Sequence, residues 1–172
     1  IKKIKLKNGL NFSAKKITIS TSGIPKVIKH MAHEDLKCNL AVSLHSAIQK
    51  TREKIMPFSE KFPIEDLIDS LKYWYRVTKT KILYEYIIFD GINDNIEHIK
   101  ALIKICKIIP CKVNFIEYNP TDDKTFRQCK VEKLKLYQNY LASEGIINTY
   151  RISRGRDINA ACGQLVNLNK VS

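Results

Sequence analysis

The sequence has no long hydrophobic run and little glycine or proline. None of its apolar stretches approaches the roughly 18 residues that a membrane span requires, so we expect no integral membrane protein. Its 172 residues contain only 6 Gly and 5 Pro against 44% hydrophobic residues, which excludes a collagen-like or disordered chain. This length and composition predict a single domain over residues 1–172.

Cysteines at metal-binding spacing are also missing. The five cysteines are irregularly spaced and no Cys-x-x-Cys occurs, which argues against a disulfide framework or a self-contained zinc site. We interpret Cys38, Cys106 and Cys111 as inert core thiols and Cys129 as a surface thiol. The N-terminus shows no secretory signal, so we expect a cytoplasmic protein. The chain begins with Ile1, and we expect it to be a piece of a longer chain.

Acidic residues are few relative to basic ones. The 30 Lys and Arg residues against 17 Asp and Glu residues give a net charge of +13. Such an excess favours a polyanionic partner, because cations that neutralise phosphates release counterions. Arg151, Arg154 and Arg156 lie close together, and arginine suits phosphate recognition. A solvated lysine-rich surface and a solvated basic loop are the alternatives.

Strand and helix signals alternate along the chain. Apolar or β-branched segments predict five strands, at residues 16–20, 38–45, 82–89, 113–118 and 146–152. Amphipathic segments predict helices after Pro25, after Pro63, after an Asp94–Glu97 capping box, and before Gly145. Near-continuous apolar strands separated by helices are typical of a mainly parallel sheet covered by those helices. We therefore expect an α/β fold, an open or partial (βα) barrel.

The C-terminal ends of the strands are the expected site, because ligands bind there in such folds. This rule selects residues 20–23, 43–45, 90–94 and Asn119, which we expect along one rim. Each has an ordinary alternative: a polar turn at 21–23, a structural histidine at His45, and a turn-shaping amide at Asn119. A group of potential metal ligands, His30, His33, Glu34 and Asp35, lies where a helix ends, so we favour a solvated terminus and expect no metal site there.

Cys162 lies in a segment of small residues, Ile158-Asn159-Ala160-Ala161-Cys162-Gly163-Gln164-Leu165. The small side chains give room for close approach, and the nearby Arg154 and Arg156 favour a thiolate. A buried, inert thiol is the alternative interpretation.

The segment 158–165 resembles the radical S-adenosylmethionine (SAM) RNA methyltransferases of the RlmN/Cfr family. Four further segments are similar to family motifs and follow in the same order, at residues 17–23, 40–45, 52–57 and 113–120. The similarity covers nearly all of residues 15–168, and five ordered motifs make it specific.

The resemblance implies the C-terminal part of a radical-SAM partial (βα) TIM-like barrel. It also implies an enzyme that methylates C2 of an adenosine in 23S rRNA and, in RlmN-type members, in the tRNA anticodon loop. One SAM methylates a cysteine, matched here by Cys162, and a second is cleaved at a [4Fe-4S] cluster to a radical that activates this methyl group. The residues that match SAM contacts are Ser20, Ser43, Leu44, His45 and Asn119.

Two family motifs have no counterpart here, the Cys-x-x-x-Cys-x-x-Cys cluster motif and a Gly-Glu motif. We expect both upstream of Ile1, and since the cluster needs its thiolate ligands, we expect this chain alone to be inactive. The resemblance further implies an electron donor such as flavodoxin, no membrane, and a monomeric full-length enzyme. A Cfr-type enzyme that methylates C8 of the same base and a non-catalytic RNA-binding remnant are the alternatives.

Overall fold

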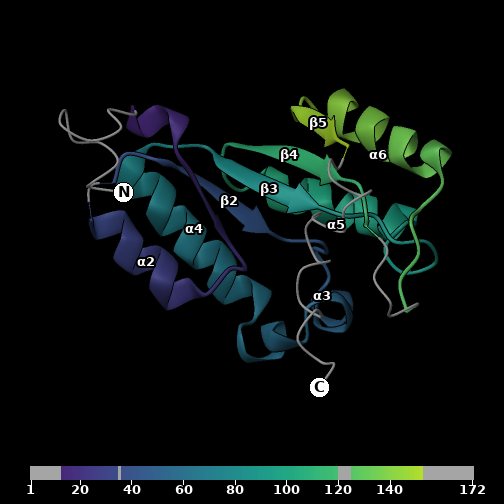
Figure 1. The fold of residues 1–172 in the computed structure, drawn as a ribbon, viewed down its shortest axis with the longest axis horizontal. Coiled ribbons are helices and arrows are strands. Elements are labelled where there is room, and N and C mark those ends of the chain that lie inside the picture. Colours follow the sequence, from purple (N-terminus) through teal and green to yellow (C-terminus); the bar gives the residue numbers. More distant parts are fainter. Residues whose placement is uncertain (1–12, 35, 120–124, 153–172) are drawn as a thin grey trace, which may run out of the picture.

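Five parallel strands form one sheet in the computed structural model, which describes residues 13–34, 36–119 and 125–152 (Figure 1). The strands lie in sequence order, each hydrogen-bonded in parallel to the next. They are β1 (Thr18–Thr21), β2 (Asn39–Ser43), β3 (Ile82–Tyr86), β4 (Cys111–Ile116) and β5 (Asn148–Arg151). The α/β fold with a parallel sheet is therefore confirmed.

Helices connect the successive strands. The crossovers are α2 (Pro25–His33), α3 (Gln49–Ile55) with α4 (Ile64–Thr78), α5 (Ile96–Cys106) and α6 (Val131–Ser143), and two short 3₁₀ turns are η1 (Ala14–Lys16) and η2 (Pro57–Lys61). Because parallel crossovers are right-handed and the strand order never reverses, the main crossover helices all cover the same face of the sheet. Helices α2 and α4 pack side by side (Figure 1).

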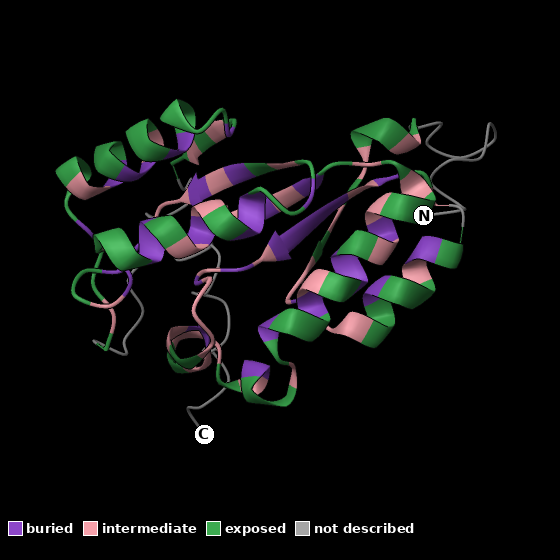
Figure 2. Ribbon diagram, turned by 180° about the vertical axis from the view of Figure 1, so that it is seen from behind, coloured by how far each residue is buried: buried purple, intermediate pink, exposed green. Residues whose placement is uncertain are grey.

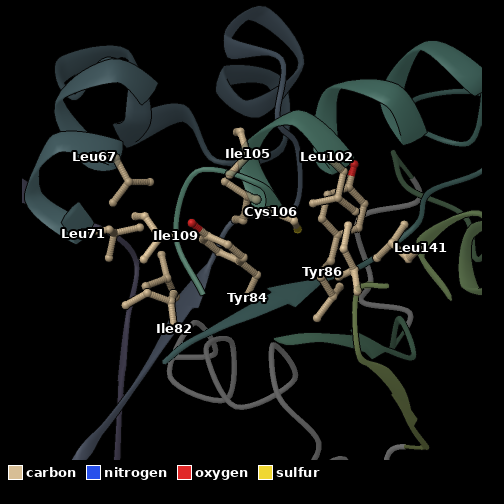
Figure 3. Packing of buried hydrophobic residues seen from close by; sticks show 14 of the residues in the cluster. Leu67, Leu71, Ile82, Tyr84, Tyr86, Leu102, Ile105, Cys106, Ile109 and Leu141 are labelled. Carbon is tan, nitrogen blue, oxygen red and sulfur yellow. The ribbon is translucent and has the colours of Figure 1, made fainter. Parts of the chain in front are cut away.

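The core lies between these helices and one face of the sheet. Along β3, Ile82, Tyr84 and Tyr86 are buried and alternate with half-buried Leu83 and Glu85. Figure 3 shows the three buried side chains among others from α4, α5 and α6, namely Leu67, Leu71, Leu102, Ile105, Cys106 and Leu141. In Figure 2 the buried residues gather in the central strands and on one side of each long helix.

Strand β3 ends earlier than the sequence pattern predicts. The apolar run continues to Phe89, but the ladder stops at Tyr86. Side chains bind the next backbone groups: the Ile87 N–H donates to His45 Nδ1 at 3.2 Å and the Phe89 N–H to Asn93 Oδ1 at 2.6 Å. These contacts occupy the N–H groups that a longer strand would use in the ladder, so β3 ends at Tyr86.

Two expectations about single residues were wrong. Asn95, and not Asp94, caps α5, where its side chain accepts from the His98 N–H at 3.2 Å. Cys129 is buried, because the segment after the loop bridges back onto Phe89 and its own N–H donates to the Ile88 carbonyl. Helix α3 was not predicted.

No helix in the described part of the chain has both the length and the hydropathy to cross a membrane; α4, with 15 residues, falls short of a span.

Candidate functional site

The second face of the sheet carries a row of polar side chains. Ser43 pairs with Glu85, Glu85 with Asn114, and Asn114 with Thr149 across strands β2 to β5. Strand side chains alternate between faces, so this polar row points away from the helix-covered core that takes Tyr84 and Tyr86. The Thr149 hydroxyl donates to Asn114 Oδ1 at 2.9 Å. Ser20 shares the polar face, because it pairs with Ala41, two residues before Ser43.

Sequence analysis found Ser20 and Ser43 but missed Glu85, Asn114 and Thr149. In the sequence these three residues are visible only as polar residues within otherwise apolar strands. Their alignment into one row becomes evident only when the strand register is known. The register places these three residues in one row with Ser43, each on the next strand of the sheet.

A tight turn follows β1 at the C-terminal edge of the sheet. Gly23 has a φ of +99°, and its N–H donates to the Thr21 hydroxyl at 3.1 Å. A Cβ at this position would lie 3.1 Å from Leu67 Cδ1 and 3.2 Å from Arg52 Nη2. Only glycine therefore fits both the backbone conformation and the space left by these two side chains.

His45 follows β2 and is held as a neutral hydrogen-bond donor. It has a φ of +52°, and its Nδ1 accepts the Ile87 N–H, so the proton of the neutral ring is on Nε2. Burial, and then the positive charge of Arg52, lower the pKa of His45 to about 4. At neutral pH this side chain can donate from Nε2 but cannot supply a proton as an acid.

Asn93 joins the ends of two strands to α6. Its Nδ2 donates to the main-chain carbonyls of His45 at 2.6 Å and Ile87 at 2.9 Å. The main-chain carbonyl of Asn93 accepts from the Tyr137 hydroxyl. The side chain is fully buried. Of the segment 90–94, the structure thus brings Asn93 to the rim beside His45. Asp94 instead pairs with Lys133 of α6 at 3.7 Å, and Asp90 is exposed.

Arg52 of α3 is a buried residue that sequence analysis noted only as part of a motif. Its side chain is 0% exposed, and Nη2 donates to the Ser22 carbonyl at 2.9 Å. The guanidinium carbon lies 5.9 Å from the centre of the Phe58 ring. Arg52 thus links the turn after β1 to the segment that follows β2, the two places where the predicted contacts cluster.

The remaining predicted residues differ in what they offer to this edge. Leu44 buries its side chain and donates its N–H to the Glu85 carbonyl at 3.0 Å, so it has only main-chain atoms near the edge. Asn119 is 4% exposed and follows β4. Cys162 lies outside the described residues, and so do Arg154 and Arg156. His33 is bound to the Tyr73 hydroxyl at 2.6 Å.

The described residues fit SAM but not an iron–sulfur cluster. Hydroxyl groups on the polar face, an uncharged His45 donor and an amide at Asn119 match the polar atoms of a nucleoside carrying an amino acid. A cluster needs cysteine thiolates. Among residues 13–34, 36–119 and 125–152 no group of three or more His, Cys, Asp or Glu side chains could hold a metal, and burial raises the pKa of Cys129 to about 11.

Curated relatives resemble the chain along nearly its whole length. A probable dual-specificity RNA methyltransferase RlmN of Flavobacterium johnsoniae is 57% identical over 159 residues, which cover 92% of this chain and 46% of that protein. A protein of the same name from Christiangramia forsetii is 54% identical over 167 residues, which cover 97% of this chain and 47% of that protein. The chain thus spans about half the length of these relatives. No family model matches it.

Solved structures share the fold. A radical SAM methyltransferase from Sphaerobacter thermophilus superposes with a TM-score of 0.88 at 36% identity, over 94% of this chain and 47% of that chain. A domain of a pyruvate-formate lyase-activating enzyme from Bacteroides vulgatus gives a TM-score of 0.60 at 13% identity over 78% of this chain and 80% of that chain, a likeness of fold alone. Sequence and fold agree that the chain is similar, over about half of their length, to proteins named dual-specificity RNA methyltransferase RlmN and to a radical SAM methyltransferase.

Proposed function

We propose that this chain is the C-terminal part of a radical SAM enzyme that methylates C2 of an adenosine in 23S rRNA and in the tRNA anticodon loop. The supporting observation is 57% identity over 92% of the chain to a protein named as a dual-specificity RNA methyltransferase. The chain spans about half of that protein, so the activity belongs to the full-length enzyme. The isolated chain is expected to be inactive, with its cluster ligands supplied by the other half.

SAM binds at the C-terminal edge of the sheet in this proposal and supplies the methyl group. The hydroxyls of Ser20 and Ser43 lie on the polar face and are available to its ribose or amino-acid part. His45 donates from Nε2, because its Nδ1 is occupied by the Ile87 N–H. Asn119 and the main chain of Leu44 complete the set. Each of these groups is neutral, which suits the nucleoside part of the ligand.

Cys162 carries the methyl group as S-methylcysteine in this proposal. The assignment comes from its motif, because Cys162 lies outside the described residues. The RNA partners suit the net charge of +13. We also propose an electron donor such as flavodoxin, a monomeric enzyme and a cytoplasmic location.

Replacement of the proposed methyl carrier tests this function in the full-length protein. Cys162→Ala should abolish methylation, because it removes the thiol proposed to carry the methyl group, while RNA binding and iron content stay at the wild-type level. Cys111→Ala, at the half-buried start of β4, is the control and should retain activity. The readout is mass spectrometry of nucleosides from digested rRNA and tRNA.

The same measurement separates the alternatives. Full turnover by Cys162→Ala would refute the role of this cysteine. An 8-methyladenosine product from the wild-type protein would favour the Cfr-type reaction. Salt-sensitive RNA binding without any methylation would favour the non-catalytic remnant.

A further inference from the structure

Arg52 is a buried cation whose hydrogen-bonding capacity is mostly unused. Its side chain is 0% exposed, and one of its three nitrogens, Nη2, donates to the Ser22 carbonyl. Nε and Nη1 have no hydrogen-bond partner in the structure that covers residues 13–34, 36–119 and 125–152. A buried donor without a partner is destabilising, and a buried positive charge requires an anion even more strongly.

The acidic side chains of the described residues do not meet this requirement. Glu53, the next residue on α3, accepts a hydrogen bond from Gln49 Nε2 at 2.7 Å. The ion pairs formed among described residues involve lysine or histidine, and none includes Arg52. The one ring near the guanidinium, Phe58 at 5.9 Å, offers only a weak cation–π contact.

Arg52 lies at the edge where ligands bind in parallel sheets. Helix α3 lies beyond the C-terminal end of β2 (Figure 1). The guanidinium contacts the turn after β1 through Ser22, and glycine at position 23 leaves room for Nη2. The charge of Arg52 is also close enough to lower the pKa of His45. The guanidinium is therefore in the neighbourhood of His45, one of the residues proposed above to bind SAM.

We propose that Arg52 binds a carboxylate group at the C-terminal edge of the sheet. A carboxylate is planar and matches the fork of a guanidinium. A phosphodiester of RNA carries a nucleoside on each side and therefore fits a buried guanidinium less well than a carboxylate, which ends its chain and needs less room. Two sources supply this chemistry: the methionine carboxylate of SAM, which rests on the proposed function, or an acidic side chain from the rest of the full-length protein.

The first arm of the test compares two ligands in the full-length protein. Dissociation constants for SAM and for decarboxylated SAM are measured by equilibrium dialysis in wild type, Arg52→Gln and Arg76→Gln, an exposed arginine of α4 that serves as the matched control. If Arg52 binds the carboxylate of SAM, wild type and control prefer SAM by about tenfold or more, as expected for a charge-assisted contact. Arg52→Gln then binds both ligands with nearly equal affinity.

The second arm measures thermal unfolding without ligand for wild type and Arg52→Met. If the carboxylate comes from the protein, SAM preference is unchanged by Arg52→Gln, and Arg52→Met melts about 5 °C or more below wild type at pH 7 because it leaves a buried carboxylate unpaired. This difference shrinks at pH 4.5, where such a carboxylate takes up a proton.

The proposal is wrong if Arg52→Gln leaves the SAM preference unchanged and Arg52→Met is as stable as wild type at pH 7. That result would assign the free nitrogens to buried water or leave them unused. A wild-type protein that fails to bind SAM at all would overturn the proposed function, whereas the unfolding arm would still decide the role of Arg52.

Discussion

At the scale of single residues, the fold changes the chemistry of His45 more than its type suggests. An isolated histidine titrates near pH 6.5, but burial and the charge of Arg52 lower the pKa of His45 to about 4. The Ile87 N–H fixes the tautomer by donating to Nδ1. A residue that the sequence offers as a possible acid or base is therefore a neutral donor in the folded protein.

This shift predicts a pH dependence of stability. Between pH 6.5 and about 4 the unfolded chain binds a proton at His45 that the folded protein does not. The contribution of the neutral His45 ring to the free energy of unfolding is thus complete above pH 6.5 and is lost as the pH falls toward 4. His45→Gln should flatten the decline in urea midpoint between pH 7 and pH 5, whereas His30→Gln, on the exposed side of α2, should leave it unchanged. An unaltered decline in His45→Gln would contradict the assignment.

Two glycines with positive φ allow a second prediction at this scale. Gly23 and Gly91 have φ values of +99° and +69°, so alanine is strained at both. Only at Gly23 would the new Cβ also press on Leu67 and Arg52, since nothing lies within 4 Å of that position at Gly91. Gly91→Ala should cost about 1 kcal/mol and Gly23→Ala about 2–3 kcal/mol of unfolding free energy. Equal losses in chemical denaturation would argue against crowding at Gly23.

At the scale of elements, two asparagines near the start of α5 have different structural roles. Asn95 caps the helix with one hydrogen bond to the His98 N–H. Asn93 holds the segments after β2 and β3 together through three hydrogen bonds of its side chain. The same residue type therefore serves one helix end in the first case and the junction of two strand ends in the second.

Alanine substitution of each residue should show that the two roles contribute differently to the free energy of unfolding. Asn95→Ala should lower the free energy of unfolding by about 1 kcal/mol, the usual cost of a lost N-cap. Asn93→Ala should cost about 3 kcal/mol, because it leaves the Phe89 N–H and two carbonyls without partners in a buried region. Urea denaturation of both variants measures the difference. A smaller loss for Asn93→Ala than for Asn95→Ala would show that the junction relaxes around the missing amide.

At the scale of the whole molecule, the two faces of the sheet differ in polarity. The chain also has a large positive net charge. One face packs under four long helices, and the other carries the polar row. The net charge of +13 makes attraction to RNA a property of the molecule rather than of one side chain.

The charge predicts steep salt dependence of RNA binding by the full-length protein. If six or more phosphates are neutralised, affinity for an rRNA fragment should fall about 10³-fold between 50 and 200 mM salt. Filter binding over this range gives the slope, and Arg52→Gln should share it, because Arg52 is buried and does not face RNA in our proposal. Binding that is insensitive to salt would contradict a phosphate-based interface.

The sequence by itself determined the alternation of strands and helices and hence the parallel α/β fold, because apolar periodicity is local. It also determined that the C-terminal strand ends carry Ser20, Ser43, His45 and Asn119. Strand ends were less well predicted, since residues 87–89 have the composition of a strand but bind side chains of His45 and Asn93 instead of a neighbouring strand.

Only the tertiary structure decided the register of the polar row, the neutral state of His45 and the burial of Arg52. These properties depend on contacts between residues far apart in the chain, such as Arg52 with Ser22 across 30 positions and Ile87 with His45 across 42. Local periodicity carries no information on such pairs. Burial then determines the protonation state of His45 and the hydrogen-bond partners open to Arg52. The chemistry of the site therefore follows from packing rather than from residue type.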